Sequence, residues 1–143
     1  MASADRFSNK TVIVTGAGSG IGRATSVRLA AEGAHVVATD VVEARLTALA
    51  AELGDTVSTV TGDIADSTVI DQILDATKGK VDGLANVAGI MDGFLPTAEI
   101  DDETWDRVLA VNLTGMMRLT RAVRQQFHRW PRRNNSPQQS LGC

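Results

Sequence analysis

The sequence predicts an α/β fold, a doubly wound parallel sheet with helices on both faces that is incomplete at about four strands in the order 3-2-1-4. Short runs of β-branched residues alternate with longer stretches of helical period, which is typical of βαβ units. A glycine-rich loop, 16–22, lies between the first such run and the first helical stretch. That placement is typical of Rossmann-type folds.

Four strands are expected, each rich in β-branched residues, at 11–15, 35–39, 56–61 and 81–87. A first helix is expected between the glycine loop and Gly33, which stops it. Its expected apolar face is made of Ile21, Ala24, Val27 and Ala31.

Three further helices follow from apolar residues at three-and-four spacing. The second ends at Gly54 and the third near Gly79, and the last and longest spans 102–123. Their apolar positions are, in order, Val42, Leu46, Leu49, Ala50 and Leu53; Val69, Ile70, Ile73 and Leu74; and Trp105, Val108, Leu109, Asn112, Leu113, Met116, Leu119 and Val123.

Residues 1–123 are therefore expected to form one domain, and 124–143 a disordered basic tail. The tail has four arginines, two prolines and no acidic residue. Because four charges without a structured scaffold make a poor nucleic-acid site, we interpret it as a solvated extension. Its abrupt loss of pattern favours the hypothesis of an interrupted or shifted reading frame.

The composition is that of an ordinary soluble domain, with 43% hydrophobic and 22% charged residues and a net charge of −3. Neither nucleic acid nor a membrane is an expected partner, since the net charge is negative and no apolar run approaches the length of a membrane span. No secretory signal is visible, so a cytoplasmic location is expected. The one cysteine, Cys143, excludes an intrachain disulfide, and no metal site is expected.

The glycine loop predicts a site for the pyrophosphate of a dinucleotide. Glycines let the backbone turn tightly and let phosphate oxygens approach the amide groups at a helix N-terminus. The residues expected to contribute are Thr15, Gly16, Ser19, Gly20, Ile21 and Gly22. On the glycines alone, a purely structural strand-to-helix turn remains an alternative.

Asp40 ends the second expected strand, where its carboxylate can accept hydrogen bonds from both hydroxyls of an adenine ribose. The same charge would repel a 2′-phosphate, and no basic residue stands between Gly16 and Gly20, so NAD is favoured over NADP. As an alternative, Asp40 is the N-cap of the next helix. Arg23, the nearest cation, is interpreted as a solvated helix residue.

Four motifs in this order resemble the short-chain dehydrogenase/reductase family. They are TGAGSGIG at 15–22, Asp63-Ile64, the turn Asn86 to Gly89, and Val111-Asn112, and the resemblance covers about residues 8 to 123. It implies that Asp63 and the Ile64 amide hold the adenine ring. It also implies that the turn with Asn86, Ala88 and Gly89 supports the sheet and lines the cofactor pocket.

Asn112 would be, by the same resemblance, the asparagine of the family's catalytic tetrad, which orders a water in the active site. Alternatively, Asn112 satisfies backbone groups at a helix kink. The family's reaction is hydride transfer between the cofactor and a secondary alcohol or ketone, with a tyrosine whose pKa a lysine lowers as the acid or base.

This sequence has no tyrosine, and neither Ser136 nor Ser140 is followed by Tyr-x-x-x-Lys. His35 begins a strand and His128 lies in the tail, so neither is expected to replace the tyrosine. We therefore expect these 143 residues to be inactive by themselves. A small-molecule substrate is expected for full-length relatives only. The alternatives are a non-catalytic module for NAD or adenosine and an interaction module that pairs copies through the helix at 102–123.

Overall fold

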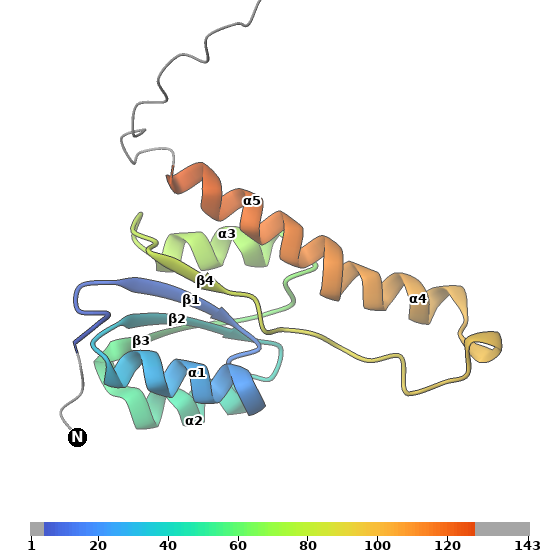
Figure 1. The fold of residues 1–143 in the computed structure, drawn as a ribbon, viewed down its shortest axis with the longest axis horizontal. Helices are drawn as coiled ribbons and strands as arrows, with labels where there is room; N and C mark the ends of the chain where they lie inside the picture. The colour runs from blue at the N-terminus through green and yellow to red at the C-terminus, as the bar shows by residue number, and fades with distance from the viewer. Residues whose placement is uncertain (1–4, 128–143) are drawn as a thin grey trace, which may run out of the picture.

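The protein is described by a computed structural model over residues 5–127. Strands and helices alternate along the chain, as predicted (Figure 1). The elements are β1 (Thr11–Thr15), α1 (Gly20–Ala31), β2 (His35–Asp40), α2 (Glu43–Leu53), β3 (Val57–Thr61), α3 (Ser67–Ala76), β4 (Gly83–Ala85), α4 (Asp102–Leu109), a π-helix (Ala110–Gly115) and α5 (Met116–Phe127). Short 3-10 turns lie at Gly54–Thr56 and Thr97–Glu99.

The four strands form one parallel sheet in the order β3-β2-β1-β4, which confirms the predicted order. β1 is central and pairs with β2 from Thr11 opposite His35 to Thr15 opposite Thr39. β2 pairs in turn with β3, so that Asp40 lies opposite Thr61. All four strands therefore end at the same edge of the sheet.

Helices cover both faces of the sheet. Side chains alternate between the two faces along each strand, so an apolar strand presents apolar side chains on both faces, and each face must be covered. α1 and α2 lie on one face, and α3 and α5 on the other (Figure 1). Val12 and Val14 of β1 face the first pair of helices in a cluster with Leu46 and Leu49. Ile13, between them in the sequence, packs into the opposite cluster with residues of α3 and α5, among them Ile70, Ile73, Leu119 and Val123.

The apolar face predicted for α1 is wrong at Ile21, Ala24 and Ala31, which are exposed, whereas Val27 packs against the core as predicted. Ile21 is 76% exposed, and the buried residues of this helix are Gly22 and Ser26. The Ser26 hydroxyl donates to the carbonyl oxygen of Gly22 at 2.9 Å, so its polar group is satisfied inside the protein. Small residues on this side let the helix approach the sheet closely.

The stripe predicted for α3 is confirmed, since Val69, Ile70 and Ile73 are buried. The N-cap of this helix is Asp66, whose carboxylate accepts from the backbone amide of Thr68 at 2.8 Å. These hydrogen bonds to Thr68 lower the pKa of Asp66, because they favour the ionised carboxylate.

The long helix predicted at 102–123 is interrupted by the π-helix and runs on to Phe127, four residues into the predicted tail. Residues 128–143 of that tail lie outside the described residues. Leu119 and Val123 are buried as predicted, whereas Trp105 and Leu113 are 57% and 55% exposed. A Cβ added at Gly115 would lie 2.8 Å from the carbonyl oxygen of Ile64, so this end of the π-helix packs directly on the segment after β3.

β4 is shorter than predicted, three residues rather than the expected 81–87. Its ladder with β1 runs only from Val12 opposite Gly83 to Val14 opposite Ala85. Residues 86–89 leave the strand because they form a turn whose amides bind Thr15, as described below. A long segment then leads to α4 (Figure 1).

Between residues 5 and 127, no helix is both long and apolar enough to cross a membrane. Over the same residues, no three side chains of His, Cys, Asp or Glu gather as a metal site would require.

Candidate functional site

The residues predicted to bind a ligand gather at the edge where the parallel strands end. The glycine loop follows β1, Asp40 is the last residue of β2, and Asp63 and Asn86 follow β3 and β4. The chain order of the strands reverses between β1 and β4. In open α/β sheets, ligands bind outside the carboxyl ends of the strands at such a switch point.

The glycine loop needs its glycines for both space and backbone conformation. Gly16 and Gly20 have φ values of 64° and 50°, which side chains rarely adopt. A Cβ at Gly16 would lie 2.9 Å from the Cα of Ala88, and one at Gly22 would lie 2.0 Å from the carbonyl oxygen of Gly16. The loop is therefore packed against the start of α1 and against the turn after β4.

The N-terminus of α1 is left without a side-chain cap. Ser19 is the N-cap residue, but its side chain makes no capping hydrogen bond. The first amides of a helix have no partner within the helix, and together with the helix dipole they attract an anion. Ser19 and Ile21 are exposed beside them, so a phosphate group can approach this end of the helix from solvent.

Thr15 fastens the end of β1 to the turn after β4. Its hydroxyl oxygen accepts hydrogen bonds from the amides of Val87 and Ala88, both at 3.0 Å. Thr15 is fully buried. The sequence predicted both Thr15 and Ala88 as residues of one site. It did not predict this direct contact, because the two segments are far apart in the chain.

Asp40 is held against the glycine loop by backbone amides. Its side chain is buried, and its two carboxylate oxygens accept hydrogen bonds from Gly18 at 2.9 Å and from Val42 at 3.0 Å. Val42 is the N-cap of α2, so the alternative that Asp40 is that N-cap is wrong. A Cβ at Gly18 would lie 2.8 Å from a carboxylate oxygen of Asp40, which makes Gly18 a site residue that the sequence analysis missed.

Asp63 and Ile64 form the turn that follows β3. One carboxylate oxygen of Asp63 accepts from the amide of Ala65 at 2.9 Å, and the other forms an ion pair with Arg107 of α4 at 2.6 Å. Arg118 of α5 donates to the carbonyl oxygen of Ala65 at 3.4 Å. Both arginines were missed, because no local pattern connects residues so distant in sequence.

Asn86 connects the turn after β4 to α5. Its side-chain amide donates to the hydroxyl oxygen of Thr120 at 3.1 Å, and that hydroxyl donates to the carbonyl oxygen of Met116 at 2.8 Å. The side chain therefore supports the position of the turn, in keeping with the role that the family resemblance implies for it.

Asn112 lies in the π-helix and binds the backbone of Ile90. Its side-chain oxygen accepts from the Ile90 amide and its side-chain nitrogen donates to the Ile90 carbonyl, both at 2.8 Å. The side chain satisfies backbone groups at an irregular part of the helix, as the alternative reading predicted, although these groups belong to the segment after β4. A side-chain amide used in this way holds the segment at Ile90 in place, and it is neither an acid nor a base near neutral pH.

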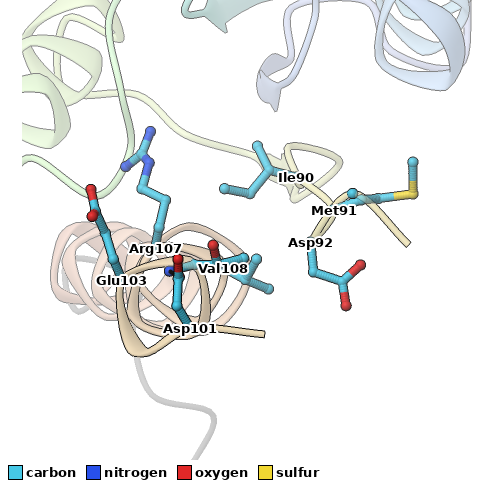
Figure 2. A pocket seen from close by; sticks show the side chains of 9 residues that line it. Ile90, Met91, Asp92, Asp101, Glu103, Arg107 and Val108 are labelled. Atoms are coloured by element: carbon cyan, nitrogen blue, oxygen red, sulfur yellow. Dashed lines mark hydrogen bonds between the residues drawn. The ribbon is translucent and has the colours of Figure 1, made fainter. Parts of the chain in front are cut away.

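A hollow of about 420 Å³ lies between the segment after β4 and α4 (Figure 2). Asp101, which lines it, is the N-cap of α4 and accepts from the Thr104 amide at 2.7 Å; the hydrogen bonds to Thr104 lower its pKa. The lining residues are Ile90, Met91, Asp92, Gly93, Asp101, Glu103, Thr104, Arg107 and Val108.

The remaining candidates lie away from this edge or have other partners. His35 begins β2 at the opposite end of the sheet, where its ring nitrogen lies 2.9 Å from the hydroxyl oxygen of Ser58. Arg23 forms an ion pair with Glu52 of α2. His128, Ser136, Ser140 and Cys143 lie outside the described residues.

The fold and this edge define a Rossmann-type α/β protein. The family model for short chain dehydrogenase matches residues 10–135, which extends past the predicted domain boundary at Val123. The chain therefore belongs to the short-chain dehydrogenase family, and the resemblance inferred from the four motifs is confirmed.

Relatives and solved structures agree with this assignment. The chain is 43% identical over 130 residues to the (5R,7aS)-5-hydroxy-7a-methyl-1-oxo-2,3,5,6,7,7a-hexahydro-1H-indene-carboxyl-CoA reductase of Mycobacterium tuberculosis, covering 85% of this chain and 49% of the relative. It is 37% identical to the 3beta-hydroxysteroid dehydrogenase 2 of Eggerthella lenta, with the same coverage. The 3-ketoacyl-(acyl-carrier-protein) reductase of Brucella melitensis complexed with NADH superposes with a TM-score of 0.82 at 34% identity, covering 85% of this chain and 52% of that one. The chain thus spans about half the length of these proteins.

Proposed function

We propose that this chain binds the adenosine half of NAD at the carboxyl edge of its sheet, as part of an oxidoreductase that moves a hydride between NAD and a secondary alcohol or ketone. The observation that carries the proposal is Asp40, whose carboxylate is fixed against the glycine loop by the amide of Gly18. We further propose a cytoplasmic setting, in keeping with the single cysteine.

The residues at this edge suit a dinucleotide. The uncapped amides at the start of α1 suit the pyrophosphate, and the backbone space at Gly16 and Gly22 is too small for side chains. The oxygens of Asp40 retain lone pairs beyond the two hydrogen bonds they accept, so they can also accept from ribose hydroxyls. Its negative charge opposes a 2′-phosphate, which supports NAD over NADP.

The proposed activity takes its chemistry from the cofactor. NAD, when bound, accepts or supplies the hydride. The residues of this chain bind and orient: Asp63 and Ile64 are proposed to hold the adenine, Asn86, Ala88 and Gly89 to shape the pocket wall, and Asn112 to fix the segment at Ile90. Without a tyrosine among the 143 residues, we propose that the chain binds without completing the hydride transfer.

Isothermal calorimetry on the full chain tests the proposed binding. NAD and ADP-ribose should bind with similar, modest affinity, because both carry the adenosine and pyrophosphate groups, whereas NADP should bind more weakly. Absence of heat with NAD and ADP-ribose at millimolar concentration would refute the proposal. Turnover of NADH or NAD by the pure chain across a panel of ketones and alcohols, followed by absorbance, would contradict the proposed lack of catalysis.

A second copy of the chain is a proposed partner through α4 and α5. The supporting observation is that large apolar side chains are exposed along α4, the π-helix and α5, and pairing would remove them from water. These side chains are Trp105, Leu113, Met116 and Met117. Size-exclusion chromatography with light scattering tests this, and a strict monomer over a range of concentrations would contradict it.

A further inference from the structure

We infer that Arg107 is a positioning residue for nucleotide binding: it holds the carboxylate of Asp63 in the orientation that accepts the 6-amino group of adenine. Arg107 thereby contributes to the preference for adenine over a 6-oxopurine such as hypoxanthine. This inference rests on the proposed binding of the adenosine half of NAD.

The carboxylate of Asp63 is fixed at two points. The amide of Ala65 donates to one oxygen at 2.9 Å, and the guanidinium of Arg107 contacts the other at 2.6 Å. One contact comes from the turn itself and the other from Arg107 of α4, 44 positions after Asp63 in the chain. Two anchors on different oxygens fix the plane of a carboxylate, whereas one anchor leaves it free to rotate.

The held carboxylate retains acceptor capacity. An ionised carboxylate offers about four lone-pair sites, and the two contacts use two of them. Because it can only accept, it favours an amino group, which brings N–H donors, and disfavours a carbonyl oxygen at the same position of the base. The 6-position is where adenine and hypoxanthine differ, so this carboxylate is suited to distinguish them.

Arg107 is itself well placed by α4. Asp101 caps this helix through the amide of Thr104, and Figure 2 shows the Arg107 side chain extending from the helix, its guanidinium turned away from Met91 and Asp92. The side chain is half exposed, so the ion pair is modest in strength and acts by orientation more than by affinity.

Arg118 provides a matched control. It reaches from α5 to the same turn after β3, but it donates to the backbone carbonyl oxygen of Ala65 and not to the carboxylate of Asp63. Loss of Arg118 removes a comparable positive charge near the turn, while Arg107 and the amide of Ala65 still hold the carboxylate of Asp63.

The test compares ADP with IDP, which share the ribose and pyrophosphate and differ at the 6-position of the base. Calorimetry on the full chain should give a preference for ADP of about tenfold for the unmodified protein. Arg107→Gln should reduce the ratio of the two affinities by about two- to fivefold. Arg107→Lys should restore part of it, and Arg118→Gln should leave it unchanged.

The outcomes separate this inference from the proposed function. If the unmodified chain binds neither nucleotide, the proposed adenosine binding fails and the inference with it. If it binds both equally, nucleotide binding stands, but selection of the base by Asp63 and Arg107 is overturned. If the unmodified chain prefers ADP and Arg107→Gln keeps or raises that preference, only the role of Arg107 is overturned.

If circular dichroism shows that Arg107→Gln does not fold, the affinities of the unmodified chain for ADP and IDP are measured at about 0.05 M and about 0.5 M salt. Salt screens the half-exposed ion pair of Arg107 and Asp63. The effect of salt on binding of the pyrophosphate is the same for ADP and IDP, so it cancels in the ratio of their affinities. A ratio that falls with salt supports the role of Arg107, and an unchanged ratio overturns it.

Discussion

Asp40 and Gly18, 22 positions apart in the sequence, are joined by a hydrogen bond of 2.9 Å from the glycine amide to the carboxylate. The bond is buried, and the absence of a side chain at Gly18 is what makes it possible, since a Cβ there would lie 2.8 Å from the same oxygen. The end of β2 and the glycine loop are therefore directly joined. A carboxylate fixed in this way can discriminate between ligands by charge as well as by hydrogen bonding.

Substitution of that carboxylate should change the preference between NAD and NADP. We expect Asp40→Asn to weaken NAD binding about tenfold, because an amide makes weaker hydrogen bonds to ribose hydroxyls than a carboxylate does. Binding of NADP should improve or stay constant, because the repulsion of the 2′-phosphate is lost. Calorimetry with both ligands measures the ratio.

The control for this prediction is Asp71→Asn, which removes an exposed carboxylate from α3. It should leave both affinities unchanged. Equal losses for NAD and NADP in Asp40→Asn would show that the aspartate supports the loop only and has no role in selecting the ribose.

Thr15→Val should lower the free energy of unfolding by about 2 kcal/mol, because the amides of Val87 and Ala88 lose their acceptor in a partly buried place. Valine keeps the volume of threonine, so the effect reports on the hydroxyl. Urea denaturation followed by circular dichroism measures it.

Thr15→Ser keeps the hydroxyl and serves as the matched control. It should lose less stability than Thr15→Val, since only a methyl group is removed. If the serine variant is the less stable of the two, the packing of the methyl group matters more than the two hydrogen bonds.

The parts of the fold that the sequence predicted are those set by local pattern. β1 matches its predicted range and β2 differs by one residue, because β-branched runs buried on both faces leave a continuous apolar signal. The buried stripe of α3 was also predicted, because its apolar residues recur at helical spacing. β4 was predicted too long because Val87 continues the apolar run, although its amide donates to the side-chain hydroxyl of Thr15 and not to a backbone carbonyl oxygen of β1.

The parts that the sequence did not predict depend on contacts between distant segments. The apolar period runs through 102–123 without a break, so nothing local signals the π-helix at Ala110–Gly115. The packing of Gly115 on Ile64 and the hydrogen bonds between Asn112 and Ile90 appear only when the π-helix meets the turn after β3 and the segment after β4. At the site, motifs predicted Asp63 but not its partner Arg107.

Gly22 should tolerate a methyl group far less well than Gly20. A Cβ at Gly22 would lie 2.0 Å from the carbonyl oxygen of Gly16, so Gly22→Ala must displace the loop, at a cost of about 3 kcal/mol. Gly20 has open space around its Cβ position and a φ of 50°, so Gly20→Ala should cost only about 1 kcal/mol of backbone strain. Urea denaturation of both variants tests the order, and a smaller loss for Gly22→Ala would contradict it.

Asn112→Leu should loosen the segment after β4. The substitution removes the two hydrogen bonds to the Ile90 backbone while keeping a side chain of similar size. We expect limited proteolysis to cut near the exposed Met91 and Phe94 several times faster than in the unmodified chain. Leu113→Asn, which changes an exposed neighbour, is the control, and equal cleavage rates for Asn112→Leu and the unmodified chain would contradict a positioning role of Asn112.

Glu32 should make the stability of the fold depend on pH below about 4.5. Its carboxylate is buried at the end of α1, where it accepts from Arg6 at 2.5 Å and also pairs with Arg28. The hydrogen bond from Arg6 is the main cause that lowers the pKa of Glu32 from 4.5 to about 2. A carboxylate with a lowered folded-state pKa contributes stability that is fully present above its unfolded value, and that contribution is lost as the pH falls from there through about 2.

Glu32→Gln removes this contribution and should therefore reduce the difference in unfolding free energy between pH 6 and pH 3 relative to the unmodified chain. Arg6→Ala, which keeps Glu32 and its contact with Arg28, should show an intermediate pH dependence. Urea denaturation at a series of pH values measures the three curves. If the curves for Glu32→Gln and the unmodified chain stay parallel from pH 6 to pH 3, the ion pairs of Glu32 do not contribute to stability. The segment at Arg6 would then be held by its other contacts, such as the amide of Phe7 donating to the carbonyl oxygen of Glu32 at 3.0 Å and the packing of the Phe7 side chain against the core.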